Sequence, residues 1–116
     1  GHDVSKVNGS VSAEAGRSYG DLDTVNGSIR MGDRASADLV ETVNGSVTLG
    51  DGARAREVST VNGSIRGGRN VEIANGAETV NGAIEFDDAS RVGGDVGTVN
   101  GKITLHAVDV RGRLTT

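Results

Sequence analysis

One seven-residue phrase recurs along this chain and limits its possible folds more than any other feature. It reads TVNGSIR at residues 24–30 and 60–66 and TVNGSVT at 42–48, with the variants TVNGAI at 79–84 and TVNGKI at 98–103. The Asn-Gly pairs of this motif, each preceded by Val, begin at Asn8, Asn26, Asn44, Asn62, Asn81 and Asn100, so the intervals are 18, 18, 18, 19 and 19 residues. A fixed period of about 20 residues with several copies indicates a solenoid.

Apolar residues fall into columns when the repeats are aligned on these asparagines. The position four residues before Asn holds Val4, Leu22, Val40, Val58, Ala77 and Val96, and the position three residues after it holds Val11, Ile29, Val47, Ile65, Ile84 and Ile103. Within a repeat the apolar residues are mostly two apart, which is the period of a strand rather than of a helix. Each repeat is therefore predicted to form two or three short strands joined by tight corners.

Two folds fit this pattern. In an antiparallel meander each Asn-Gly pair would be a type I′ hairpin turn. In a parallel β-helix each repeat is one coil, and its residues stack on their equivalents about 4.8 Å away. The near-identical flanks of these six Asn-Gly pairs favour the second fold, because such stacking places like residues on like. We therefore predict an all-β fold, a single parallel β-helix of about six coils of 18–19 residues.

This β-helix is expected to form one domain over residues 1–116. The sequence stops at Thr115-Thr116, where another TVNG would begin, so we expect it to be a fragment of a longer chain.

The Asn-Gly pairs themselves are predicted to be structural. Gly tolerates positive φ, and Asn tolerates left-handed backbone better than most residues, so each pair is predicted to form a corner. Stacked asparagines can also hydrogen-bond their amides from coil to coil. We therefore predict an amide ladder made of Asn8, Asn26, Asn44, Asn62, Asn81 and Asn100. The alternative is that this row of exposed amides binds a ligand.

Two columns beside the asparagines compete for the core. Strict alternation cannot place Leu22 and Val25 on the same face, because they are three residues apart. Either the corner bends so that the valine column reaches the core, or these valines form an exposed stripe suited to lateral association; we expect the bend. The valine column is Val25, Val43, Val61, Val80 and Val99, and the threonine column is Thr24, Thr42, Thr60, Thr79, Thr98 and Thr116. For the threonines we expect Thr–Thr hydrogen bonds between neighbouring strands.

Composition argues against several classes of protein. The net charge is −4 and charges of both signs are spread along the chain, which argues against a nucleic-acid partner. There is no Cys, and therefore no disulfide and no thiolate metal site. No apolar run approaches the roughly 20 residues that cross a bilayer, so no membrane span is expected in this segment. One Tyr, one Phe and no Trp imply a narrow interior of small aliphatic side chains.

No group of residues in the sequence suggests catalysis. His106 stands alone at an expected corner and is interpreted as an exposed bystander. Four aspartates at similar places in the coil could in principle hold Ca²⁺, but the glycine-rich nonapeptide of calcium-binding β-rolls is absent. These aspartates are Asp33, Asp51, Asp87 and Asp88. We therefore expect no enzyme activity, no catalytic residue, no metal site and no cofactor, and the sequence does not define ligand-binding residues.

The motif TVNGSI, with its variants TVNGAI and TVNGKI, resembles the VNGSI-type bacterial adhesin-like repeat domains of unknown function. The resemblance covers nearly the whole chain. It implies a right-handed parallel β-solenoid that is exported, periplasmic or on the cell surface, and it supplies no catalytic residues. A weaker likeness is to bactofilins, which are polymer-forming β-helices with a similar coil length but without the Asn-Gly corners.

These observations lead to three functional hypotheses. The first is a non-enzymatic structural or adhesive module of a bacterial envelope or secreted protein, with envelope proteins or surface glycans as partners. The second is a self-assembling, polymer-forming scaffold that associates through its solenoid ends, where strand edges are unpaired. The third is a carbohydrate-binding or carbohydrate-active β-helix.

Overall fold

Each repeat folds into one long and one short strand, as the alternating pattern predicts. The computed structural model describes residues 2–115 of the chain. Its long strands are β1 (His2–Asn8), β3 (Tyr19–Asn26), β5 (Ser36–Asn44), β7 (Arg54–Asn62) and β9 (Glu72–Asn81). Its short strands are β2 (Val11–Ala13), β4 (Ile29–Met31), β6 (Val47–Leu49), β8 (Ile65–Gly67), β10 (Ile84–Phe86) and β13 (Ile103–Leu105).

Near the C-terminal end the long strand is divided in two. One coil contributes β11 (Arg91–Val92) and β12 (Val96–Asn100), and the next contributes β14 (Asp109–Val110) and β15 (Leu114–Thr115). Within residues 2–115 there is no helix long and apolar enough to cross a membrane.

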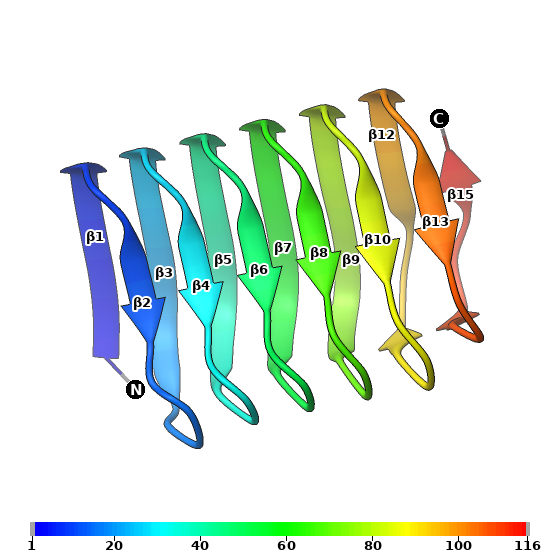
Figure 1. Cartoon of the computed structure of the whole chain (residues 1–116), viewed down its shortest axis with the longest axis horizontal. Helices are drawn as coiled ribbons and strands as arrows, with labels where there is room; N and C mark the ends of the chain where they lie inside the picture. Colours follow the sequence, from blue (N-terminus) through cyan, green and yellow to red (C-terminus); the bar gives the residue numbers. More distant parts are fainter. Residues whose placement is uncertain (1, 116) are drawn as a thin grey trace.

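Every strand pairs in parallel with its equivalent one coil away (Figure 1). The long strands form a nine-stranded sheet in the order β1-β3-β5-β7-β9-β11-β14, with β12 beside β9 and β15 beside β12, and the short strands form a six-stranded sheet. The registers place each Asn opposite the Asn of the next coil, as for Asn26 and Asn44. The predicted parallel β-helix of about six coils is therefore confirmed, and the antiparallel meander is excluded.

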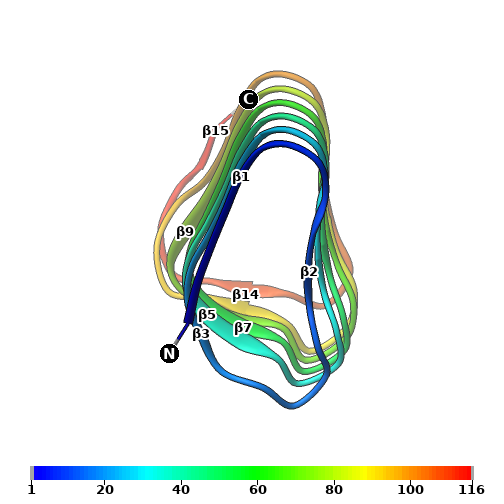
Figure 2. The same cartoon turned by 90° about the vertical axis from the view of Figure 1, so that its left-hand side faces the viewer.

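The coil has three sides, and its hand can be followed in Figure 2. The first side carries the C-terminal part of each long strand, the second carries the short strands, and the third carries the first residues of each long strand. Viewed from the N-terminal end, the chain runs clockwise as it recedes, so the β-helix is right-handed.

The core is a narrow column of stacked aliphatic side chains. On the short strands the burial pattern is buried, exposed, buried, so that the first and third residues point inward. On the first side, Leu22, Val40 and Val58 are completely buried and lie directly over one another. A coil with three such narrow sides has no room for many large rings, which explains the scarcity of aromatic residues.

The expected bend at the valine column was wrong. On the first side strict alternation continues to the end of each long strand, so threonine points inward and the following valine points outward. The threonines of residues 24, 42, 60, 79 and 98 are at most 4% exposed, whereas Val25, Val61 and Val80 are 37–39% exposed. Val43 is half-buried and Val99 is 66% exposed. The column Val25, Val43, Val61, Val80 and Val99 therefore forms a partly exposed stripe on the outer surface.

The buried threonines are satisfied by glycine carbonyls rather than by one another. Thr42 Oγ1 donates to the carbonyl oxygen of Gly27, one coil back, at 2.8 Å, and Thr60 Oγ1 donates to that of Gly45 at 2.9 Å. The same bond recurs at Thr24, Thr79 and Thr98, and Thr116 lies outside the described residues. The expected Thr–Thr hydrogen bonds were wrong, because the hydroxyl reaches the Asn-Gly corner of the preceding coil.

Replacing Thr42 by Val should lower the free energy of unfolding by about 1–2 kcal/mol, because the Gly27 carbonyl loses a buried donor while the side-chain shape is kept. Thr48→Val is the matched control, since Thr48 points outward on β6. Its effect should stay within about 0.5 kcal/mol. Chemical denaturation of both variants measures this difference, and equal effects would contradict the role assigned to the hydroxyl.

The Asn-Gly corner does not use left-handed backbone, contrary to expectation. Positive φ occurs once per coil at the corner that follows the short strand, at Gly16, Arg34, Gly52, Asn70, Ala89 and Ala107. Among the glycines of the Asn-Gly pairs only Gly9 has a positive φ, of 144°. The glycines are needed for another reason: a Cβ on Gly27 would lie 2.1 Å from the carbonyl oxygen of Gly9.

The third corner, between the third and first sides, lengthens along the molecule. A β-bulge between Ala55 and Glu57 in the pairing of β7 with β9 marks the step. Two residues separate Ala55 from Val58, whereas three residues separate Ile73 from Ala77. The later coils keep three residues at this corner, and the long strand breaks there into β11 and β12.

Candidate binding groove

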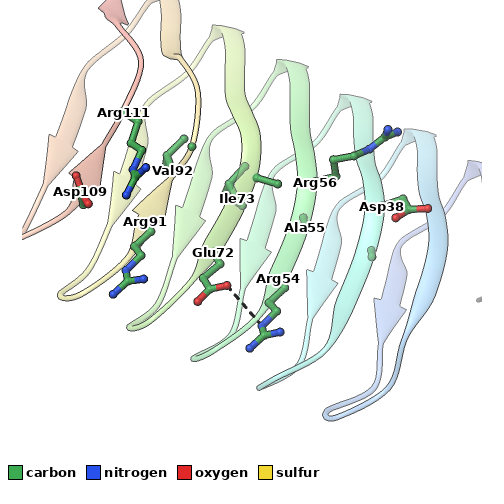
Figure 3. Close-up of a pocket in the computed structure, with 13 residues that line it drawn as sticks. Asp38, Arg54, Ala55, Arg56, Glu72, Ile73, Arg91, Val92, Asp109 and Arg111 are labelled. Atoms are coloured by element: carbon green, nitrogen blue, oxygen red, sulfur yellow. Dashed lines mark ion pairs between the residues drawn. The ribbon is translucent and has the colours of Figure 1, made fainter.

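A pronounced depression of the described surface lies on the third side, next to the lengthened corner. It has a volume of about 650 Å³ and crosses the coils from β5 to β14 (Figure 3). It is lined by Ala37, Asp38, Arg54, Ala55, Arg56, Glu72, Ile73, Ala74, Arg91, Val92, Gly93, Asp109 and Arg111. We call it the third-side groove.

One wall of the third-side groove is a row of alternating charge. The first outward residue of successive coils is Arg54, Glu72, Arg91 and Asp109, and the strand registers place these residues side by side. Opposite charges on neighbouring strands stabilise the sheet. Arg54 Nε lies 3.7 Å from Glu72 Oε2, which is the ion pair drawn in Figure 3.

The row beside it produces the hollow. Asp38 and Arg56 hold equivalent outward positions in successive coils, but the next two coils have Ala74 and Gly93 there, and the last has Arg111. The long side chains are therefore missing from the middle of the row and present at both ends. Gly93 also cannot carry a side chain, because its Cβ would lie 2.3 Å from the Ala74 carbonyl oxygen.

Three guanidinium groups at the groove lack a close carboxylate. Within residues 2–115, Arg56, Arg91 and Arg111 form no ion pair within 4.0 Å. All three side chains are exposed. Arginine remains charged at any physiological pH and binds carboxylates through two parallel hydrogen bonds. The groove can therefore bind anionic groups, and its carboxylates can accept hydrogen bonds from hydroxyls.

A second surface combines the asparagines with the valine stripe. The Nδ2 group of each asparagine donates to Oδ1 of the asparagine one coil back, at 2.8–2.9 Å, from Asn26 through Asn100. All six side chains, from Asn8 to Asn100, are exposed. A shallow hollow of about 360 Å³ follows the valines toward Val99 and Thr115. The amide ladder stabilises the corner and leaves the remaining amide hydrogens facing solvent.

Two of the four aspartates considered for calcium hold the backbone of the following coil. Asp33 Oδ1 accepts a hydrogen bond from the backbone N–H of Asp51, and Asp51 Oδ1 accepts one from Arg69, both at 3.0 Å. Within residues 2–115 no group of three His, Cys, Asp or Glu side chains is placed to hold a metal ion. His106 is exposed, and its Nε2 lies 3.9 Å from Glu85 Oε2.

The sequence analysis did not find the third-side groove. Its residues lie at equivalent positions that hold different residue types in successive coils, so no repeated motif marks them in the sequence. The available signal was the change in period from 18 to 19 residues between Asn62 and Asn81, which is where the corner lengthens.

We compared the chain with protein-family models, curated proteins and solved structures, and none of these comparisons finds a match. The resemblance to adhesin-like repeat domains therefore stays a prediction.

Proposed function

We propose that this protein is a non-enzymatic structural or adhesive module of a bacterial envelope or secreted protein. The observation that carries the proposal is the uninterrupted stack: each coil of residues 2–115 passes directly from one strand to the next, and the result is a set of flat, periodic outer faces. Repeat architectures of this kind commonly present extended binding surfaces.

The charges on these faces also support binding rather than catalysis. A catalytic site needs a base, a nucleophile or a metal converging on one point in a sheltered pocket. The third-side groove instead spreads its arginines and carboxylates along several coils, open to solvent along its length. Such an arrangement suits recognition of an extended partner.

Adhesion can be measured by immobilising the whole chain and testing retention of isolated cell-envelope fractions and of a surface-glycan array. We expect reversible, salt-sensitive retention, because exposed charges are screened by salt. The same glycans should be recovered with unchanged length. Steady shortening of a polysaccharide by the purified protein would contradict a non-enzymatic function.

A further inference from the structure

We propose that the third-side groove binds a linear acidic glycan whose carboxylates are separated by hydroxyl-bearing, uncharged sugar. This inference deepens the proposed adhesive function and rests on it. It names the ligand class and the residues that recognise it.

The length of the groove fits an extended chain. Arg56 and Arg111 stand at equivalent positions three coils apart, which corresponds to about 14 Å along the axis. Between them, Ala74 and Gly93 leave the floor free of long side chains. A ligand lying along the axis can contact Arg111 and Arg91 at one end of this floor (Figure 3). At the other end the Arg56 side chain extends over β5 toward Asp38, and it would turn toward Ala74 to contact the same ligand.

The alternating charges along the wall of the groove determine which kind of anionic polymer can bind there. Glu72 and Asp109 lie beside Arg91 in the same row. A polymer charged at every unit, such as nucleic acid, would set some of its charges against these carboxylates, where like charges repel. A glycan with spaced carboxylates can place them at the arginines and its hydroxyls at Glu72 and Asp109, because carboxylates accept hydrogen bonds from hydroxyls.

The lining of the groove disfavours two other partners. Protein interfaces depend on apolar or aromatic anchors in pockets, and the apolar lining residues Ala55, Ile73 and Val92 are buried and point into the core. Single-stranded nucleic acids stack their bases on aromatic side chains, and no aromatic residue lines the groove. Sugar hydroxyls and carboxylates need neither feature.

The test is calorimetric titration of the whole chain with a hyaluronan oligosaccharide, in which carboxylate-bearing and neutral sugars alternate. Arg56→Gln and Arg111→Gln should each weaken binding about tenfold, the effect of losing one charge-assisted hydrogen bond. Arg30→Gln is the matched control, because it removes the same charge from an exposed position of β4 on the second side. It should leave the affinity unchanged.

A second variant separates the groove from general electrostatic attraction. Ala74→Leu keeps every charge but fills the floor, and it should weaken binding as strongly as the arginine variants do. Because Arg30, Arg56, Ala74 and Arg111 are all exposed, we expect each variant to fold, and thermal unfolding checks this.

Four results would overturn the inference: no binding of hyaluronan, equal binding of a neutral dextran oligosaccharide, tighter binding of a heparin oligosaccharide or of single-stranded DNA, or equal losses for Arg30→Gln and Arg111→Gln. If the groove variants still adhere to envelope fractions like the unaltered protein, the groove is not the adhesive site, although the proposed function stands. Loss of all adhesion by the unaltered protein would instead defeat the proposed function.

Discussion

Replacing both Gly67 and Phe86 by Leu is expected to cost less stability than either replacement alone. The two residues occupy the same inward position in neighbouring coils. A Cβ on Gly67 would lie 2.4 Å from Phe86 Cδ1, so the ring of Phe86 fills the space that Gly67 leaves empty. Phe86 is completely buried. The large ring of Phe86 is therefore matched to the glycine that faces it in the same column.

The single variants fail for opposite reasons. Gly67→Leu forces a side chain into the ring and should cost about 3 kcal/mol of unfolding free energy. Phe86→Leu leaves a void over Gly67 and should cost about 1.5 kcal/mol. In the double variant both new leucines would lie between the native Leu49 and Leu105 of the same column. The column would then hold leucine in each of these coils, and the total cost should be about 1 kcal/mol.

Urea titrations of the four proteins give the coupling energy, which we expect to be about 3.5 kcal/mol in favour of the double variant. Additive losses would show that the two positions do not share one space.

Gly45→Ala should destabilise the protein far more than Gly97→Ala. A Cβ on Gly45 would lie 1.9 Å from the carbonyl oxygen of Gly27, so the two coils must separate at this corner. That separation stretches the hydrogen bonds from Gly27 N to the Asn44 carbonyl oxygen, 3.1 Å, and from Asn44 Nδ2 to Asn26 Oδ1, 2.8 Å. We expect a loss of about 3 kcal/mol or more in unfolding free energy.

Gly97 supplies the control for this substitution. It lies on β12, and its Cβ would approach no atom closer than 3.7 Å. Gly97→Ala should therefore be neutral or stabilise by about 0.5 kcal/mol, because Ala restricts the unfolded chain. Thermal and urea unfolding of both variants measure the difference. Similar midpoints would mean that the coils spread at no cost, and that glycine is not needed at the corner.

The fold could be predicted because equivalent residues occupy equivalent places. Leu22, Val40 and Val58 share a column in the sequence and lie over one another in the structure. The same logic predicted the row of asparagines, whose amides are bonded from coil to coil. In a β-helix the period of the sequence is the period of the structure, so alignment of the repeats gives the strand register.

The inward and outward faces of the corner were harder to predict. Apolarity suggested that Val43 rather than Thr42 would be buried, but a glycine carbonyl needed a donor inside the corner, and only the hydroxyl provides one. The contact between glycines of adjacent coils was equally hidden, because it joins residues 18 positions apart rather than neighbours in the chain. The third-side groove was missed because it arises where the repeats differ.

The lengthened third corner has a consequence for how such a chain can change its length. Coils with two residues at this corner, such as the one through Arg56 and Glu57, match one another, and so do coils with three. Duplicating or deleting a complete repeat inside either block preserves every strand register. Moving a repeat from one block into the other would create a new mismatch on both of its faces. The repeats are therefore interchangeable within a block but not between the two blocks, despite their nearly identical sequences.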